Sequence, residues 1–230
     1  MTSTKPTPFL PQHLDEIQGW FFDLDGTLMD TDDQAMEAVA HRLRILGQPR
    51  SRQLARRVVM LSETPMNHAM TLLDIVGLDP WILALRRRLS RRVEPTFRLI
   101  PGVRPVIQHL ATEGQLLAVV STRSQEDAAL FLKQHALSEH FRLLATEETT
   151  RRLKPHPEPV LYTAEQLGLD PVACVMVGDT TVDMRAARRA GAWAVGVLCG
   201  FGEEAELWRA GAHMVLESTA DLLPLVTQSR

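Results

Sequence analysis

The stretch FFDLDGTLMD at residues 21–30 decides the fold of this chain. An apolar run over residues 17–22 is cut off by Asp, Asp and Gly, as is typical of a buried strand that ends in a loop. In a parallel α/β sheet, ligands bind at this end of the strands. Alternation of side chains predicts that Asp23 and Asp25 lie on the same side of the chain, with Leu24 turned away. Two carboxylates placed in this way require a cation or a shared proton.

The residues after this pair suit a tight, polar loop. Gly26 allows the chain to turn sharply, and Thr27 can bond the loop backbone or a bound anion. An ordinary turn is the alternative explanation for two Asp and a Gly after a strand. Polar residues elsewhere in the chain distinguish between these alternatives.

Length and composition indicate a folded globular protein. The chain has 230 residues, of which 45% are hydrophobic, which is enough for a sizeable core in one domain with an insertion or in two modest domains. The formal net charge of −3 gives no indication of a nucleic-acid or membrane-surface partner. Lysines are rare, so a lysine placed by a motif is more informative than usual. They are Lys5, Lys133 and Lys154.

The sequence shows no export signal or membrane-spanning segment, and we expect a cytoplasmic protein. Residues 1–14 are rich in Pro and Thr and lack an apolar segment of the export type, and the hydrophobic runs elsewhere are too short to span a bilayer. Cys174 and Cys199 lie in or near apolar runs and are expected to be small core residues, which fits a reducing compartment. The oligomeric state, monomer or homodimer, is left open.

The hydrophobic pattern changes after residue 30, where apolar residues recur at helical spacing with no strand-like alternation. Helical segments are expected at about 31–46, 51–61, 65–76 and 80–93. Residues 31–96 are therefore predicted to form an all-helical insert between the two parts of a core at 15–30 and 97–230. Residues 1–14 are expected to be a flexible lead-in, because their prolines oppose regular structure.

After residue 100, helical and strand-like segments alternate. Strands are expected at 116–120, 141–145, 173–177, 192–198 and 214–216, after a first strand at 17–23. Helices are expected at 102–113, 124–135, 157–167, 181–190 and 203–210, followed by a last helix. This alternation predicts a doubly wound, mostly parallel, Rossmann-like sheet with helices on both faces. Polar loops at the carboxyl ends of its strands are expected to converge.

One such loop follows the second strand, where Ser121, Thr122 and Arg123 come directly after an apolar run. A hydroxyl beside a helix N-terminus, whose N–H groups favour an anion, suits a phosphate. A simple helix N-cap is the alternative for Ser121.

Two further positions carry charge. Lys154 precedes a proline-rich segment that fixes the backbone, although an isolated lysine is usually a solvated surface charge. Asp179 and Asp183 follow the strand at 173–177, and their spacing allows both carboxylates to face the same side of the turn. Helix capping is the alternative for these two.

Taken in order, these residues form Asp-x-Asp-Gly-Thr, a strand-terminal Ser, Lys-Pro and Gly-Asp-x-x-x-Asp motifs. With all four, the sequence resembles the haloacid dehalogenase-like phosphohydrolase superfamily over nearly the whole chain after residue 16. The helical insert is similar to the cap of the subgroup that includes phosphoglycolate phosphatases, phosphosugar phosphatases and pyrophosphatases. The agreement of four motifs counts against the simpler explanations of each.

The resemblance implies a division of roles. Asp23 would attack phosphorus and form an aspartyl-phosphate, while Asp25 would act as general acid and then general base. Mg²⁺ would be held by Asp23, the Asp25 backbone carbonyl and Asp179, with Asp183 as a direct or indirect partner. Ser121 and Lys154 would bind the phosphoryl group. Thr27, Thr122 and Arg123 are further candidates for binding phosphate or substrate.

The implied activity is Mg²⁺-dependent hydrolysis of a small phosphorylated metabolite, with phosphoglycolate-like esters as the first candidates. Inorganic pyrophosphatase and phosphosugar phosphatase or mutase are alternatives, and a phosphate-sensing or scaffold protein without turnover is another class. Arg123 departs from the Asn-Lys often found after the motif-two hydroxyl in phosphoglycolate phosphatases, which leaves the substrate open. Five arginines of the predicted cap, between residues 86 and 92, are interpreted as water-facing rather than as an anion trap.

Overall fold

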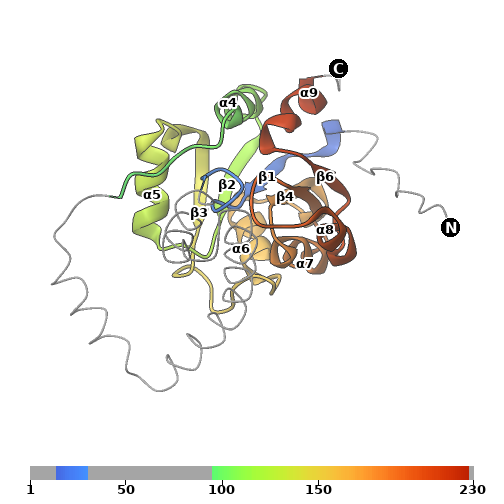
Figure 1. Cartoon of the computed structure of the whole chain (residues 1–230). Helices are drawn as coiled ribbons and strands as arrows, with labels where there is room; N and C mark the ends of the chain where they lie inside the picture. The colour runs from blue at the N-terminus through green and yellow to red at the C-terminus, as the bar shows by residue number, and fades with distance from the viewer. Residues whose placement is uncertain (1–13, 31–94, 228–230) are drawn as a thin grey trace, which may run out of the picture. The chain divides into compact units, whose positions relative to one another are not determined.

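The computed structural model describes residues 14–30 and 95–227 (Figure 1). The predicted helices of the cap lie outside the described residues, and so does nearly all of the predicted lead-in. What is described belongs to one compact unit, apart from the two residues before Phe97.

A six-stranded, fully parallel sheet forms the centre of this unit, in the order β3-β2-β1-β4-β5-β6. The strands are β1 (Gly19–Phe22), β2 (Leu116–Val120), β3 (Phe141–Ala145), β4 (Cys174–Gly178), β5 (Trp193–Val197) and β6 (Met214–Leu216). The chain runs outward from β1 to one edge through β2 and β3, then returns to the other side of β1 with β4. The strand order therefore reverses next to β1, which is where ligands bind in open α/β sheets.

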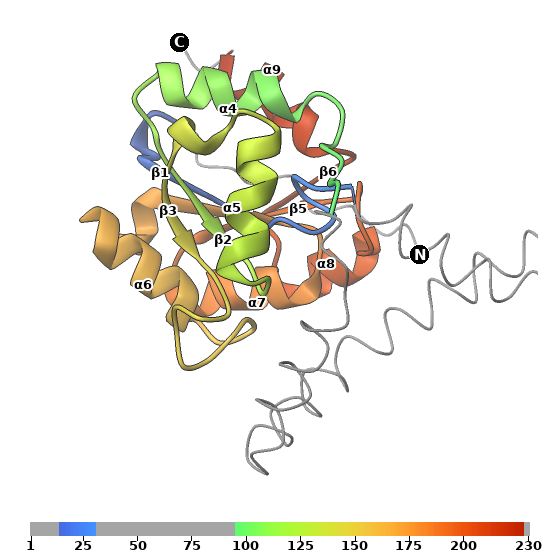
Figure 2. The same cartoon turned by 90° about the vertical axis from the view of Figure 1, so that its left-hand side faces the viewer.

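Helices cover both faces of the sheet. They are α4 (Val103–Thr112), α5 (Gln125–Gln134), α6 (Glu158–Leu167), α7 (Thr181–Ala190), α8 (Glu204–Ala210) and α9 (Leu222–Thr227), with short 3-10 helices at Leu14–Glu16, Ser138–His140, Pro171–Ala173 and Thr219–Asp221. In Figure 2, α4 and α9 lie above the sheet and α6, α7 and α8 lie below it. The doubly wound, parallel core predicted from the sequence is confirmed.

Side-chain alternation along the strands divides the core into two layers. In β1, Trp20 and Phe22 pack into the layer that contains residues of α4, α5 and α9, while Phe21 packs into the layer that contains residues of α6, α7 and α8. All three side chains are at most 2% exposed. A central strand buried on both faces explains why this part of the sequence is an apolar run rather than an alternating one.

The observed strand and helix limits differ from the expected ones by at most two residues. β1 begins at Gly19 rather than at residue 17, and it ends at Phe22, just before the first carboxylate. Such differences at element ends are common because hydrogen bonding fades there. No helix within residues 14–30 and 95–227 is long and apolar enough to cross a membrane.

The segments on either side of residues 31–97 lie next to each other. The Asp30 amide donates to the Arg98 carbonyl at 2.9 Å, and the Ile100 amide donates to the Leu28 carbonyl at 2.9 Å. The chain therefore leaves and re-enters the described core at neighbouring points. A segment placed between two such points need not disturb the sheet.

Candidate active site

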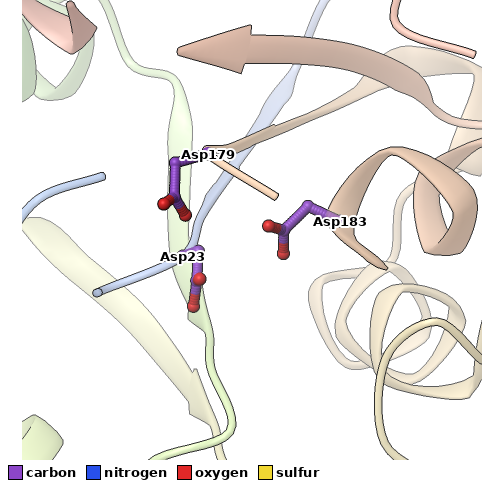
Figure 3. A group of neighbouring side chains, drawn as sticks. All are labelled: Asp23, Asp179 and Asp183. Carbon is purple, nitrogen blue, oxygen red and sulfur yellow. The ribbon is translucent and has the colours of Figure 1, made fainter. Parts of the chain in front are cut away.

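Three buried carboxylates meet at the carboxyl end of the two central strands (Figure 3). Asp23 follows β1, Asp179 follows β4, and Asp183 lies in the first turn of α7. One oxygen from each lies within 4.8 Å of the others. The backbone brings them together because β1 and β4 are paired in register, with the Asp23 amide still donating to the Val177 carbonyl at 2.9 Å.

Lys154 lies among these carboxylates, in the loop between β3 and α6. Its ammonium group, Nζ, donates to Asp183 Oδ1 at 2.6 Å and to the Val120 carbonyl at 2.8 Å, and lies 3.0 Å from Asp23 Oδ1. Lys154 therefore makes two hydrogen bonds and, in addition, an ion pair with Asp23. Because Lys154 is 5% exposed, it is not the solvated surface charge that an isolated lysine usually is. We call Asp23, Lys154, Asp179 and Asp183 the inner cluster.

The inner cluster carries excess negative charge away from water. Burial raises the pKa of Asp23 to about 7. The charge of Lys154 opposes this rise, and the charges of Asp183 and Asp25 add to it. Burial acts to lower the pKa of Lys154, but Asp183 and Asp23 outweigh it and hold that pKa above its ordinary value. Three carboxylates against one ammonium leave a formal charge of two negative when all are ionised. A divalent cation would balance that charge.

Asp183 also caps the helix on which it stands. Its Oδ2 accepts from the Thr180 amide at 3.1 Å and from Thr180 Oγ1 at 2.5 Å, while its Oδ1 binds Lys154. Helix capping was the alternative explanation for this residue in the sequence, and in the structure the same side chain caps α7 and binds Lys154. The capping bonds fix the direction in which the carboxylate approaches Lys154.

Asp179 is held by a loop that follows β5. The Phe201 amide donates to Asp179 Oδ2 at 2.8 Å. A Cβ added at Gly200 would overlap that same carboxylate, and one added at Gly202 would overlap the Asp179 carbonyl. The loop can approach so closely only because both residues are glycine.

Asp25 and Arg123 form a second pair at the same end of the sheet, which we call the outer pair. The carboxylate of Asp25 accepts from Arg123 Nε and from Nη2, each at 2.7 Å. This parallel, two-bond arrangement is the strongest that an arginine and a carboxylate make. The side chains are 30% and 27% exposed, respectively. Burial acts to lower the pKa of Arg123, but its bonds to Asp25 outweigh burial and raise that pKa.

Ser121 and Thr27 are buried near these groups. Ser121 is 4% exposed and its Oγ accepts from the Arg123 amide at 3.3 Å. It is not a helix cap, because Ser124 caps α5 by accepting from the Asp127 amide at 3.2 Å. Thr27 is fully buried, and its Oγ1 has no hydrogen-bond partner within residues 14–30 and 95–227. Thr122 and Arg123, the remaining candidates for substrate binding, are both half-buried.

Asp23 and Asp25 have different partners in the structure. The sequence predicts that they lie on the same side of an extended strand. In the structure the strand ends at Phe22, and Gly26 adopts a positive φ of 66° in the turn that follows. Asp23 joins the inner cluster, while the carboxylate of Asp25 is bound by Arg123.

Comparison with known proteins identifies a family for this chain. A family model described as haloacid dehalogenase-like hydrolase matches residues 20–197, about three quarters of the chain. This chain belongs to the haloacid dehalogenase-like hydrolase family. The match spans all the residues of the inner cluster and the outer pair.

Individual relatives cover most of the chain. A phosphoglycolate phosphatase of Xanthomonas campestris pv. campestris (strain 8004) is 30% identical over 194 residues, which is 82% of this chain and 88% of that protein. The pyrophosphatase PpaX of Bacillus mycoides (strain KBAB4) is 27% identical over 214 residues, 93% of this chain and 98% of that protein. The crystal structure of a hydrolase from Pseudomonas syringae superimposes with a TM-score of 0.64 at 25% identity, covering 92% of this chain and 98% of that one.

Within this family member, the inner cluster fits a hard divalent cation. Its donors are carboxylate oxygens, the donor type that Mg²⁺ prefers, and they come from three points of the backbone that are fixed by the sheet and by α7. The excess negative charge of the cluster supplies the electrostatic reason for a cation to bind.

The loop of residues 200–202 was not singled out from the sequence. Its signal was present, because two glycines flank Phe201 just after the strand predicted at 192–198. Glycines at the carboxyl end of a strand in a doubly wound fold indicate a close approach of backbone to a site. Cys199, next to this loop, is half-buried and packs against the core, and its Sγ donates to the Gly26 carbonyl at 3.3 Å, which links the loop to the turn after Asp25.

Proposed function

We propose that this chain is a Mg²⁺-dependent hydrolase of small phosphate monoesters, with phosphoglycolate-like esters as the first candidates, and that it acts through an aspartyl-phosphate on Asp23. The observation that carries the proposal is the inner cluster, a buried carboxylate nucleophile held between a lysine and two further carboxylates. The relatives named phosphoglycolate phosphatase and pyrophosphatase support a phosphorylated substrate.

Asp23 is the proposed nucleophile because it is the least buried carboxylate of the inner cluster. It is 8% exposed, whereas Asp179 and Asp183 are fully buried, so it is the member of the cluster that a substrate can reach. The bond formed is from a carboxylate oxygen to phosphorus, and the bond broken is from phosphorus to the ester oxygen. Water then attacks the phosphorus of the aspartyl-phosphate, the bond between phosphorus and the carboxylate oxygen breaks, and inorganic phosphate leaves as the carboxylate is regenerated.

Phosphate binding is assigned to the groups around Asp23. The hydroxyl of Ser121 would donate to a phosphoryl oxygen, and the ammonium of Lys154 would offset the charge that accumulates between Asp23 and the phosphoryl group. Two unit charges 4 Å apart interact by about 4 kcal/mol at an effective dielectric of 20, so a phosphate dianion beside several carboxylates needs these positive charges. We propose Thr27 and Thr122 as further contacts of phosphate or substrate, but not Arg123, because Asp25 occupies one edge of its guanidinium group.

Asp25 is the proposed general acid and base. It would give a proton to the departing ester oxygen and then take one from the hydrolytic water. Its place beside the nucleophile, but with a third of its side chain exposed, suits a group that must exchange protons with substrate and solvent.

Asp23 and Asp179 would hold Mg²⁺ through their side chains and Asp25 through its main-chain carbonyl, with Asp183 as a direct or indirect partner. When bound, the ion supplies positive charge to the phosphoryl oxygens and offsets the excess negative charge of the cluster. The Phe201 amide and the capping bonds from Thr180 keep Asp179 and Asp183 in place for this purpose.

Residues 31–96 are proposed to form a helical cap that carries substrate specificity. The neighbouring ends of the flanking segments, at Asp30 and Arg98, are suited to an insertion at this point. Inorganic pyrophosphatase activity is the second candidate, favoured by the match to the PpaX relative along nearly its whole length. Phosphosugar phosphatase or mutase activity uses the same chemistry.

The test is phosphate release from a panel that contains phosphoglycolate, sugar phosphates and pyrophosphate, with Mg²⁺, with Ca²⁺ and with a chelator. We expect turnover of at least one small monoester with Mg²⁺, little with Ca²⁺ because its larger and looser coordination would misplace Asp23, and none with chelator. Preference for pyrophosphate over every ester would favour the second candidate. No release from any compound under any condition would contradict hydrolysis and favour a sensing or scaffold role.

A further inference from the structure

Arg123 is bound to Asp25 more tightly than a substrate-binding arginine needs to be. Nε and Nη2 both face the Asp25 carboxylate at 2.7 Å, so one whole edge of the guanidinium is occupied by this single partner. A residue that served mainly to bind a substrate anion would gain from keeping that edge open.

The guanidinium is itself held from two other directions. It lies over the ring of Phe97, 5.4 Å from the ring centroid, and Nη1 is 3.7 Å from Asp127 Oδ2. Phe97 is 8% exposed and is fixed in turn by Phe131, whose ring meets it edge-on. The arginine is therefore braced by the core on one side while it binds Asp25 on the other.

Asp25 needs such a brace because it lies outside regular structure. It follows the end of β1 and precedes the Gly26 turn, and its side chain is 30% exposed. A free aspartate at such a position would sample several rotamers. The two bonds from Arg123 select one of them and still leave lone pairs of both carboxylate oxygens open.

We propose that Arg123 is a positioning residue that fixes the direction of the Asp25 carboxylate toward the ester oxygen of the substrate. This inference rests on the proposed function, in which Asp25 handles the leaving group's proton. Arg123 contributes through Asp25 and not through the phosphoryl group. A lysine could replace its charge but not its two parallel bonds.

The experiment compares Arg123→Met, Arg123→Lys and the wild type on an alkyl phosphate and on p-nitrophenyl phosphate. Asp127→Asn is the matched control, because it changes only the 3.7 Å contact between Arg123 Nη1 and Asp127. An alkoxide needs a proton from Asp25 as it leaves, whereas nitrophenolate does not. In single-turnover kinetics we expect Arg123→Met to slow phosphorylation of Asp23 by the alkyl phosphate on the order of 10²-fold, the size of effect that misplacing a catalytic group produces. Phosphorylation by the aryl phosphate, which also reports folding, and the concentration of either substrate that half-saturates this step should change little.

Three outcomes would overturn the proposal. Weaker saturation of the phosphorylation step by both substrates would mean that Arg123 binds the phosphate, and equal losses in that step for both would mean a general role. Full rescue by Arg123→Lys would mean that charge alone matters. The double variant Arg123→Met with Asp25→Asn adds a coupling test. Because Arg123 works through Asp25, we expect it to be no slower on the alkyl phosphate than Asp25→Asn alone.

A measurement without turnover separates this inference from the proposed function. The Nε–H proton of Arg123, identified in nuclear magnetic resonance spectra by its loss in Arg123→Lys, should be protected from exchange in the wild type and exposed in Asp25→Asn. Equal protection in both would overturn the pairing. An enzyme that hydrolyses none of the phosphates but shows the protected proton would contradict the function and leave the pairing intact, and the assignment to catalysis would then be withdrawn.

Discussion

The inner cluster and the outer pair lie at the same end of the sheet, yet they are built in different ways. Each member of the inner cluster is at most 8% exposed, and its side chains have partners fixed by β1, β4, α7 or the glycine loop. The outer pair is about 30% exposed and depends on one arginine reaching across from the loop after β2. Burial makes the inner charges interact strongly, whereas solvent weakens the interaction in the outer pair.

This difference suggests a division of labour. The proposed nucleophile and metal site both need fixed geometry, and the inner cluster has such geometry, although it holds like charges close together away from water. A proton carrier must meet both the substrate and water, so it needs exposure and takes its direction from a partner rather than from burial. Each prediction below changes one group and asks whether the two regions respond as differently as their environments imply.

The largest expected effect comes from Asp23→Asn, which should reduce turnover below detection. An amide is a very poor nucleophile, so no aspartyl-phosphate can form. The fold should be retained, because the change removes a carboxylate whose raised pKa shows that its charge is unfavourable there. Phosphate release and circular dichroism check both parts, with Asp170→Asn, at the cap of the 3-10 helix before β4, as the control for an Asp-to-Asn change outside the site. Retained activity would show that Asp23 is not the nucleophile.

The next largest effect is expected for Asp25→Asn, which should lower the reaction rate by a factor that depends on the leaving group. General acid catalysis contributes on the order of 10² to 10⁴-fold, and only a basic alkoxide needs all of it. Phosphorylation of Asp23 should therefore slow far more with an alkyl phosphate than with p-nitrophenyl phosphate. The aspartyl-phosphate should accumulate, because its hydrolysis has lost its base. Single-turnover kinetics with both substrates provide the measurement, and an equal loss in the phosphorylation step would rule out the acid role.

The third prediction concerns the loss of the positively charged side chain from each region in turn. Lys154→Met leaves Asp23 and Asp183 buried without their partner and should destabilise the protein by about 3–5 kcal/mol. Arg123→Met leaves a carboxylate that water can solvate, so the cost should be no more than about 1 kcal/mol. Urea unfolding gives both values. Mg²⁺ should recover part of the loss in Lys154→Met, and equal costs for the two variants would mean that the regions do not differ as described.

The sequence was sufficient to predict the parallel sheet, the presence of helices on both of its faces and the convergence of polar residues at the carboxyl ends of its strands. It was sufficient because these depend on local patterns, such as the apolar run before Asp23 and the polar residues directly after strands. Two contacts were out of reach. The bond between Arg123 and Asp25 joins residues 98 positions apart through side chains alone, and no spacing rule encodes it.

The approach of Gly200 and Gly202 to Asp179 was also not predicted. A glycine pair indicates that something lies close, but the identity of that neighbour depends on how β4 and β5 are placed in the sheet. Lys154 is intermediate between these cases. The Lys-Pro motif made it a candidate site residue, whereas its burial and its bond to the Val120 carbonyl are consequences of packing.

The smallest expected effect is a slope of stability with pH in the protein freed of metal by a chelator. The pKa of Asp23 is about 7 in the folded chain and 3.8 ordinarily, so between pH 4 and 7 the folded state binds more protons than the unfolded state. Stability should therefore fall as pH rises through this window, by at most about 1.4 kcal/mol per pH unit. The raised pKa of Lys154 affects stability only above its ordinary value of 10.5 and does not contribute here.

Urea unfolding at pH 5, 6 and 7 measures the slope, which should be shallower in Asp23→Asn. In Asp25→Asn most of it should remain, because burial of Asp23 is the main cause of its raised pKa and the charge of Asp25 is a lesser one. If the slope survived in Asp23→Asn but disappeared in Asp25→Asn, the carboxylate responsible for it would be Asp25. The outer pair, and not the inner cluster, would then hold the unfavourable buried charge.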